Sequence, residues 1–546
     1  MDNSSQNAAR YVVGIDIGSG SARAGVFDLR GQLMGSAKRD ISLFLEGGNI
    51  AEQSSEDIWQ AVCLCVRQAV AASHIDPSSV AGIGVDATCS LVVIGTDGQP
   101  LPVGDPARPE RNIIVWMDHR AIEQARRINA TGHEVLRYVG NRISPEMETP
   151  KLLWLKENRP EVFHKAAHFF DLTDYITWRA SGSLDRSICT TTCKWTYLAH
   201  ERRWDDSYFA AIGLPELSGE GHARIGTNIV DAGTALGRGL TEKAAGELGL
   251  LPRTAVAAGL IDAHAGGIGT IGAPSDGGNG TVTSRMAYVF GTSACTLTST
   301  VEPGFVPGVW GPYYSAMVPG LWLNEAGQSA AGAAIDHLVS LHPAAASAKA
   351  LAREAGMGVA AWLALQAAPA GSDLSELARL VDRLHVVPEF LGNRAPFADP
   401  DARAVIAGLD LSQSIESLVR LYIAGVCGIG YGLRQIIAAQ RRNGVDVDTV
   451  VISGGAGQSA LVRQLLADAA AIRIAAPVAE EPVLLGAAML GAVAAGCHKN
   501  VAQAMSAMSQ IGTLYSPKEG SLHDWHNKRF AAFELLQTTA RSLLNS

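Results

Sequence analysis

Two similar β–turn–β patterns, one near the start of each half, constrain the fold of this chain most. In the first, apolar runs at Val12–Ile17 and Ala24–Leu29 lie on either side of a Gly/Ser turn. From Met286, the sequence MAYVFGTSACTLTSTVEPG again gives an apolar strand, a turn of small residues and a second strand. Such runs bounded by small turn residues are typical of β-hairpins. The repeat therefore predicts two related α/β domains that face each other.

The length of the chain supports this division. It has 546 residues, of which 47% are hydrophobic, which is more than one hydrophobic core usually serves. We expect one domain over residues 1–275 and a second over residues 276–546. The cleft between two domains is the default place for a binding site.

Charge and apolar patterning narrow the class of partner. The 44 basic and 53 acidic residues give a net charge of −9, so there is no electrostatic reason to expect nucleic acid or an anionic membrane as partner. The longest apolar run, Pro482–Gly496, is shorter than the roughly 20 residues of a membrane span and predicts a closely packed buried helix. We expect small-molecule chemistry.

The polar start MDNSSQNAAR lacks the basic-then-apolar order of a secretory signal, and we expect a cytoplasmic protein. The eight cysteines form no C-x-x-C pair, which suits small core residues in a reducing compartment. Cys63 and Cys65 have no set of His and Cys residues at zinc spacing beside them.

Strands alternate with amphipathic helices along the rest of the chain. Ser54–Ser55 opens a helical pattern with acidic residues in its first turn, and VAGIGVDATCSLVVIGTDG places Asp86 at a strand end. Late in the chain, TVVISGGAGQSALVRQLLADAAA reads as strand, Gly-Gly turn and helix. Glycines allow close backbone approach and a helix start offers free N–H donors, so this segment predicts a nucleotide site.

Both hairpin turns are candidates for binding a polyphosphate. Phosphoryl transfer needs donors around the phosphates, a carboxylate-bound Mg²⁺ and a base for the acceptor. The first turn, close to Asp16 and Arg23, and the second turn supply small residues whose amides and hydroxyls suit phosphate oxygens. An ordinary hairpin turn is the alternative for either loop alone, and the repetition favours phosphate binding. The loop residues are Gly18, Ser19, Gly20 and Ser21, and Gly291, Thr292 and Ser293.

A single carboxylate, Asp262, follows an apolar strand and precedes a run of small residues in AAGLIDAHAGGIG. It could cap a helix by accepting from the amides of Ala265 or Gly266, or act as a general base, or do both. His264, with alanines on both sides, is interpreted as a packed core histidine.

Glu325 and Lys194 complete a candidate polyol site with Asp262. Glu325 is expected just after an apolar strand, with a helix beginning near Gln328. Lys194 stands beside Trp195 in SICTTTCKWTYL, which has the composition of a β-rich stretch. A helix cap and a solvated lysine are the alternatives. Together the three charges would supply the donors and acceptors that sugar hydroxyls need.

These residues lie in segments that resemble the FGGY carbohydrate kinases over nearly the whole chain. The similar segments are GIDIGSGSARAG, DATCSLVV, WMDHRA, PKLLWLKENRPEVF, FFDLTDYITWRASG, CKWTY, GLIDAHAGG, GTSAC, NEAGQSAAG and ISGGAGQSALVRQ. The phosphate-type loops occur in all actin-like proteins, whereas the long middle segments are more specific. DATCSLVV, VWMDHRA, CKWTY, GLIDAHAGG and VPGVWGPYYSAMVPGLWLNE resemble the pentulose kinases that phosphorylate D-ribulose.

The resemblance implies two actin-like (ribonuclease H-like) ATPase domains around a central cleft, with the sugar in the N-terminal domain and ATP mainly in the C-terminal domain. It implies that Asp262 is the catalytic base, that Ala87, Lys194, Asp262 and Glu325 bind the sugar, and that Asp16 associates with Mg²⁺. Thr292 matches the second phosphate loop, and positions around the adenosine match Gly332, Asp336, Gly455 and Ser459. Related kinases often carry an amide or hydroxyl where Asp336 stands.

The expected reaction is transfer of the γ-phosphate of MgATP to O5 of D-ribulose. L-ribulose, xylulose and a pentitol such as ribitol remain alternative acceptors, because one inverted hydroxyl leaves no signature in a sequence. Two other classes are an actin-like nucleotide-gated binding protein and a sugar sensor. The first predicts an appendage or polymer-forming insertion, neither of which we find, and the second predicts loss of the base, whereas Asp262 is present. A homodimer remains an open assembly state.

Overall fold

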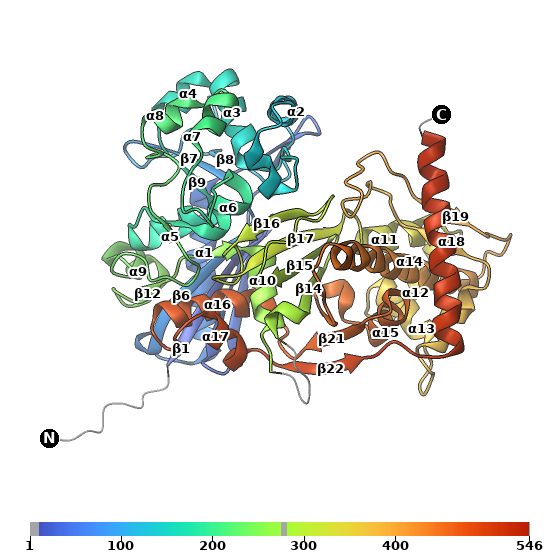
Figure 1. The fold of residues 1–546 in the computed structure, drawn as a ribbon. Coiled ribbons are helices and arrows are strands. Elements are labelled where there is room, and N and C mark those ends of the chain that lie inside the picture. The colour runs from blue at the N-terminus through green and yellow to red at the C-terminus, as the bar shows by residue number, and fades with distance from the viewer. Residues whose placement is uncertain (1–9, 275–280, 545–546) are drawn as a thin grey trace.

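The architecture is taken from a computed structural model, which describes residues 10–274 and 281–544 (Figure 1). Two sheets carry the repeated pattern predicted from the hairpins. The first has the order β12-β6-β1-β2-β3, with β13 also paired to β6. Its strands are β1 (Tyr11–Ile17), β2 (Ser21–Asp28), β3 (Leu33–Asp40), β6 (Val80–Ala87), β12 (Ala255–Val256) and β13 (Leu260–Ile261).

The second sheet lies in the C-terminal half and has the order β16-β17-β15-β14-β20-β21-β22. Its strands β20-β14-β15-β17 correspond to β6-β1-β2-β3 of the first sheet. In both sheets an antiparallel hairpin is followed by a parallel strand that pairs with the hairpin's first strand: β6 with β1, and β20 with β14. The strands of the second sheet are β14 (Arg285–Phe290), β15 (Ala294–Thr300), β16 (Trp310–Tyr314), β17 (Trp322–Gln328), β20 (Thr449–Ser453), β21 (Arg473–Pro477) and β22 (Ile511–Tyr515).

Smaller sheets extend each half. The N-terminal half carries a sheet of order β4-β5-β8-β7-β9 and the pair β10-β11, and the C-terminal half carries the pair β18-β19. These strands are β4 (Phe44–Glu46), β5 (Ile50–Gln53), β7 (Leu91–Gly95), β8 (Ile113–Ile114), β9 (Ala166–Asp171), β10 (Arg186–Ser187), β11 (Ile229–Val230), β18 (His385–Val387) and β19 (Val405–Ala407).

Helices cover the sheets of both halves (Figure 1). Those before residue 275 are α1 (Ser55–Ser73), α2 (Ile122–Ala130), α3 (Glu148–Asn158), α4 (Pro160–Lys165), α5 (Leu172–Ser181), α6 (Ile188–Trp195), α7 (Asp206–Ala211), α8 (Pro215–Gly219), α9 (Glu242–Leu248) and α10 (Asp262–Ile271). Those after it are α11 (Gly332–Leu341), α12 (Ala345–Glu354), α13 (Val359–Ala367), α14 (Ile415–Arg442), α15 (Ala460–Ala470), α16 (Pro482–Ala494), α17 (Val501–Met508) and α18 (Ser521–Leu544).

The helix predicted at Ser54–Ser55 is confirmed. Helix α1 begins at Ser55, and the Ser54 side chain accepts a hydrogen bond from the amide of Asp57, as an N-cap residue does. Val12 and Val13 in β1 pack into different clusters, Val13 with α1 and Val12 with α16. This alternation follows from the two-residue period of a strand, so β1 is covered on both faces.

Helix α16 confirms the buried helix predicted from Pro482, but it packs against the N-terminal sheet. Although it follows β21 in the chain, it contacts β1, β6 and α10, and Figure 1 shows α16 and α17 beside the first strands. A Cβ atom at Gly84 in β6 would clash with the carbonyl of Ala487. Glycine thus allows this close approach between the last part of the chain and the first sheet.

Helix α14 is the one helix in residues 10–274 and 281–544 that is long and apolar enough to cross a membrane by length and composition. Most of its apolar stretch, 83%, is buried inside the protein, where it packs against α11, α13 and α15.

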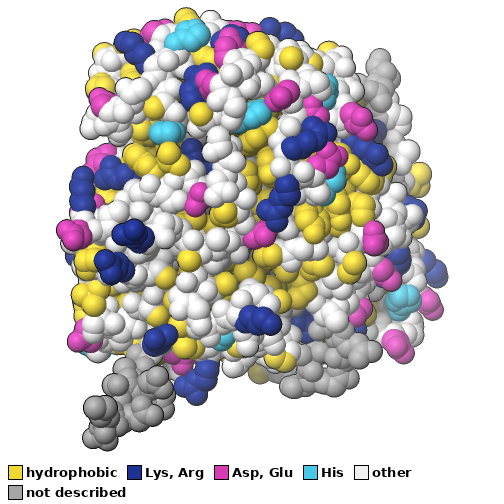
Figure 2. Space-filling view, turned by 60° about the vertical axis from the view of Figure 1, so that its left-hand side comes forward, with side chains coloured by type: hydrophobic (Ala, Val, Ile, Leu, Met, Phe, Trp, Pro, Cys, Tyr) yellow, Lys and Arg dark blue, Asp and Glu magenta, His cyan; other side chains and the backbone are white. Residues whose placement is uncertain are grey.

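Figure 2 shows acidic and basic side chains intermixed over one face of the molecule, with hydrophobic side chains between them.

Candidate active site

A cavity of about 330 Å³ lies where the two repeated hairpins meet. Its wall contains the β1–β2 loop, the start of α10, the β14–β15 loop and residues of β16 and β17. A larger surface groove of about 550 Å³ near Arg30 contains none of the predicted residues. The predicted residues that line the cavity are Asp16, Gly18, Ser19, Lys194, Asp262, Gly291, Thr292, Ser293 and Glu325.

The first phosphate-type loop is held from both of its sides. The Gly18 amide donates to the Ser21 carbonyl at 3.0 Å, which closes the turn between β1 and β2. The Trp116 indole N–H donates to Ser19 Oγ at 2.8 Å, and Gln53 Nε2 donates to the Ser19 carbonyl at 2.9 Å. These bonds fix the loop geometry without a ligand, which lowers the entropy cost of binding one.

The second loop repeats the first and is tied to helix α11. The Gly291 amide donates to the Ser293 carbonyl at 2.9 Å, the counterpart of the Gly18–Ser21 bond. The amides of Ala331 and Ala333, at the start of α11, donate to the Thr292 carbonyl at 2.9 and 3.1 Å. Both hairpin turns therefore face one cavity, as the repeated sequence pattern predicts.

Asp262 is the first residue of α10 and lines the cavity. Its carboxylate accepts one hydrogen bond, from the Ala263 amide at 2.7 Å, and makes no cap bond to Ala265 or Gly266. Burial raises the pKa of Asp262 to about 6, and the charge of Asp16 adds to this shift. The N-cap alternative is therefore wrong, and the carboxylate is free to accept a proton from a bound molecule near neutral pH.

Glu325 and Lys194 lie on elements other than those expected. Glu325 is inside strand β17, and the next helix, α11, begins at Gly332 and not near Gln328. Lys194 lies in helix α6 and not in a strand, because Ser187 caps that helix and its residues pack into the buried core. Although burial opposes ionisation, Lys194 and His264 lower the pKa of Glu325 to about 2, so this wall of the cavity carries a carboxylate.

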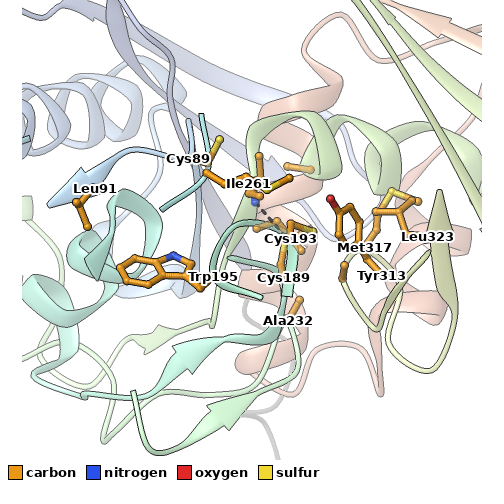
Figure 3. Packing of buried hydrophobic residues seen from close by; sticks show 14 of the residues in the cluster. Cys89, Leu91, Cys189, Cys193, Trp195, Ala232, Ile261, Tyr313, Met317 and Leu323 are labelled. Atoms are coloured by element: carbon orange, nitrogen blue, oxygen red, sulfur yellow. Dashed lines mark hydrogen bonds between the residues drawn. The ribbon is translucent and has the colours of Figure 1, made fainter. Parts of the chain in front are cut away.

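His264 lies behind Glu325 and is fully buried, as expected for a core histidine. Its Nε2 is 3.5 Å from Glu325 Oε2, and its Nδ1 is 3.0 Å from Cys189 Sγ. Cys189 Sγ also accepts from the Ile261 amide at 3.4 Å, and Figure 3 shows Cys189 and Cys193 beside Ile261. Despite burial, which lowers it, the pKa of His264 is raised to about 10 by Cys189 and Glu325. This contact places a positive charge next to Glu325.

Two carboxylates fit a divalent cation at the end of the first sheet. Asp16 and Asp86 are direct neighbours in the β1–β6 register, and both are almost completely buried. Asp16 pairs with Arg23, whereas Asp86 accepts no hydrogen bond from an amide, hydroxyl or basic side chain among the described residues, and its polar neighbour is the Asp16 carboxylate. Burial raises the pKa of Asp86 well above its usual range, and the charges of Asp16 and Asp262 raise it further. Two adjacent buried carboxylates, one of them without a basic partner, match the hard oxygen ligands that Mg²⁺ prefers.

The remaining predicted residues lie around the cavity without lining it. Ala87 is buried at the end of β6, between Ile17 and Ile261 in the sheet, and Gly20 and Ser21 complete the first turn. Gly332 donates its amide to the Gly291 carbonyl at 3.0 Å, and Ser459 caps α15. Asp336 is exposed on α11, and Gly455 is exposed at the turn after β20.

Several cavity residues received no role from the sequence. Trp116 and Trp310 stand in segments that resemble the family, WMDHRA and VWGPYY, so that signal was available. Glu146 and Arg394 come from distant loops with no motif of their own, and only the fold brings them to the site. The Glu146 carboxylate lies 3.8 Å from His119 Nε2. Although burial opposes ionisation, His119, Arg394 and Lys194 together lower the pKa of Glu146.

Comparison with known proteins matches both halves of the chain to one family. The N-terminal domain of the FGGY family of carbohydrate kinases matches residues 11–269, and its C-terminal domain matches residues 286–495. A human FGGY carbohydrate kinase domain-containing protein is 44% identical over 545 residues, covering 98% of this chain and 97% of its own. A D-ribulokinase from Saccharomyces cerevisiae is 37% identical over 516 residues, covering 89% of this chain and 72% of its own. A crystal structure described as that of a "xyloylose kinase" from Brucella ovis has the same fold, with a TM-score of 0.81 and 19% identity, covering 98% of this chain and 100% of that one.

Proposed function

Because this chain belongs to the FGGY family of carbohydrate kinases, a family of sugar kinases with two actin-like domains, we propose that it phosphorylates D-ribulose at O5 with ATP. The 37% identity to a D-ribulokinase supports this acceptor. The alternatives are L-ribulose, xylulose and ribitol.

One observation carries the proposal. The Asp262 carboxylate lines the cavity, accepts one hydrogen bond, from the Ala263 amide, and has a pKa of about 6. A general base works best when its pKa lies near the working pH, because it is then mostly ionised and still accepts a proton. Phosphate-type loops from both halves and the Lys194–Glu325 wall surround it. This is the set of groups that phosphoryl transfer to a hydroxyl needs.

In the proposed reaction, Lys194 and Glu325 hold the hydroxyls of the ketose, and Asp262 accepts a hydrogen bond from O5–H. The oxygen O5 attacks the γ-phosphorus while its proton passes to Asp262. The bond between the γ-phosphorus and the β–γ bridging oxygen breaks, giving D-ribulose 5-phosphate and ADP. The two loops align the γ-phosphate with O5, and closing of the cleft excludes water that would otherwise accept the phosphoryl group.

Asp16 is the residue that would hold Mg²⁺, through water, with Asp86 beside it. When bound, the cation would neutralise charge that develops on the phosphate oxygens. Adenosine would lie near Gly332, Gly455 and Ser459, on the C-terminal half.

A panel of pentuloses and pentitols in a coupled ADP-release assay tests the proposal. The expected result is that kcat/KM is highest for D-ribulose and that ADP release depends on sugar. A higher value for L-ribulose, xylulose or ribitol would replace the acceptor within the same mechanism. ADP release that no sugar stimulates would contradict the kinase proposal.

A further inference from the structure

The guanidinium of Arg394 reaches the cavity without forming a salt bridge. Arg394 lies in the loop between β18 and β19 and lines the same cavity as Glu325. Its Nη1 donates to Cys295 Sγ at 3.7 Å, and its guanidinium carbon is 5.6 Å from the centre of the Trp310 ring. Within residues 10–274 and 281–544, Arg394 forms no salt bridge of 4 Å or less. Although burial opposes its ionisation, Cys295 and, from a greater distance, Glu146 and Glu325 raise the pKa of Arg394.

This arrangement differs from that of Arg23, another arginine of the cavity. Arg23 pairs with Asp16 and, at 3.0 Å, with Glu481, so its charge is neutralised within the protein. Among the residues that the structure describes, the one hydrogen-bond acceptor of Arg394 is a thiol sulfur, which is a weak acceptor. A guanidinium has five N–H donors, and a partly buried cation that leaves them unused is costly unless a ligand satisfies them.

The loop that carries Arg394 is held by contacts outside the cavity. Asn393 and Asp399 exchange backbone hydrogen bonds of 2.7 and 2.8 Å, which close the loop. Arg541 in α18 pairs with Asp399 at 3.1 Å and with Glu389 at 3.5 Å. The protein therefore fixes the loop backbone beside Arg394 without using the guanidinium.

Neighbouring side chains put Arg394 beside the residues that we propose bind the acceptor. Trp310 is the β-sheet partner of Glu325, and the Lys194 ammonium lies 5.2 Å from the centre of the same Trp310 ring. Arg394 and Lys194 are thus two cations beside one aromatic ring. Glu325 and Arg394 come from the C-terminal half, whereas Lys194 and Asp262 come from the N-terminal half.

We propose that Arg394 is an acceptor-binding residue that donates to two neighbouring oxygens of the sugar from the C-terminal half of the cleft. This inference rests on the proposed function, because it assigns the guanidinium to the substrate of the same site. A planar guanidinium presents paired N–H donors, so it suits two adjacent oxygens, such as the carbonyl of a ketose and the hydroxyl next to it. A bound sugar would then contact residues of both the N-terminal and the C-terminal half, which would favour closing of the cleft between them.

The test compares Arg394→Gln and Arg394→Lys with Arg403→Gln. Arg403 stands in the same loop, is exposed and donates to the carbonyls of Pro400 and Ala402, so it controls for loss of a nearby positive charge. D-ribulose binding is measured by calorimetry without nucleotide, kcat and both KM values by the coupled assay, and Tm without ligand. If the panel selects another sugar, that sugar is used, so a wrong acceptor is distinguished from a wrong role for Arg394.

We expect Arg394→Gln to weaken sugar binding about ten- to a hundredfold, with KM for ATP and Tm unchanged, as for loss of a charged hydrogen bond. Arg394→Lys should recover part of the affinity, and Arg403→Gln should match the wild type. Unchanged sugar affinity with a lower kcat would overturn the proposal, because Arg394 would then act on the transferred phosphoryl group. Unchanged affinity and kcat would also overturn it. If Arg394→Gln has a lowered Tm, the test rests on Arg394→Lys. Wild-type sugar affinity in an Arg394→Lys variant of normal Tm would contradict binding through the paired N–H donors of the guanidinium.

Discussion

Replacing Asp262 by Asn removes the proposed base with little expected effect on the fold. The carboxylate makes one hydrogen bond in the protein, from the Ala263 amide, and the Asn side-chain oxygen can accept the same bond. Tm should therefore stay within a few degrees of the wild type. A general base contributes roughly 10²–10⁴-fold to a rate, so kcat should fall by about that factor while ATP affinity is retained.

The pH profile of the wild type gives the same residue a second test. Asp262 must be ionised to accept the proton, and with a pKa of about 6 it is mostly ionised at neutral pH. Below pH 6, kcat/KM should fall about tenfold per pH unit, and the residual activity of Asp262→Asn should lack this limb. Stopped-time assays in buffers of constant ionic strength measure both. Wild-type turnover in Asp262→Asn at neutral pH would refute the assignment.

The remaining predictions concern the acceptor, nucleotide and metal. Glu325→Gln and Lys194→Met should weaken sugar binding about ten- to a hundredfold in calorimetry. If these variants lost affinity for ATP and kept their affinity for sugar, the assignment of Glu325 and Lys194 to the sugar would be wrong. Gly455→Val should leave Tm normal, because a Cβ there meets no protein atom within 4 Å, but should raise KM for ATP. Unchanged ATP kinetics would mean that the loop is only a turn. Gly454→Val is its contrast: with φ at 91° and the Phe290 carbonyl 2.6 Å from the added Cβ, it should lower Tm. Asp16→Asn should raise the Mg²⁺ concentration needed for half-maximal activity, and an unchanged Mg²⁺ titration would exclude Asp16 from the metal site.

The two hairpins were predictable because their signals are local. Each needs only a short apolar run, a turn of small residues and a second run, and β1–β2 and β14–β15 follow these runs closely. The strand before Asp86 and the turn before Ser459 are local in the same sense. For such segments, local preference and global fold agree.

Errors arose where packing overrides local preference. The threonines before Lys194 favour a strand, yet the segment is helix α6, because the Ser187 cap and complete burial decide its structure. The small residues after Glu325 resemble a helix start, but β17 continues to Gln328 by pairing with β15. The approach of α16 to the first sheet and the arrival of Arg394 in the cavity depend on contacts between distant segments, which leave no local pattern.

A crystal structure with D-ribulose and a non-hydrolysable ATP analogue is the most direct test of the proposed mechanism. The sugar should lie between Lys194 and Glu325, with O5 within about 2.6–3.2 Å of the Asp262 carboxylate, as general-base catalysis requires. The γ-phosphate should face O5 from the loop Gly291–Ser293. A sugar bound with another group at Asp262, or with every hydroxyl beyond hydrogen-bond reach of it, would contradict the mechanism.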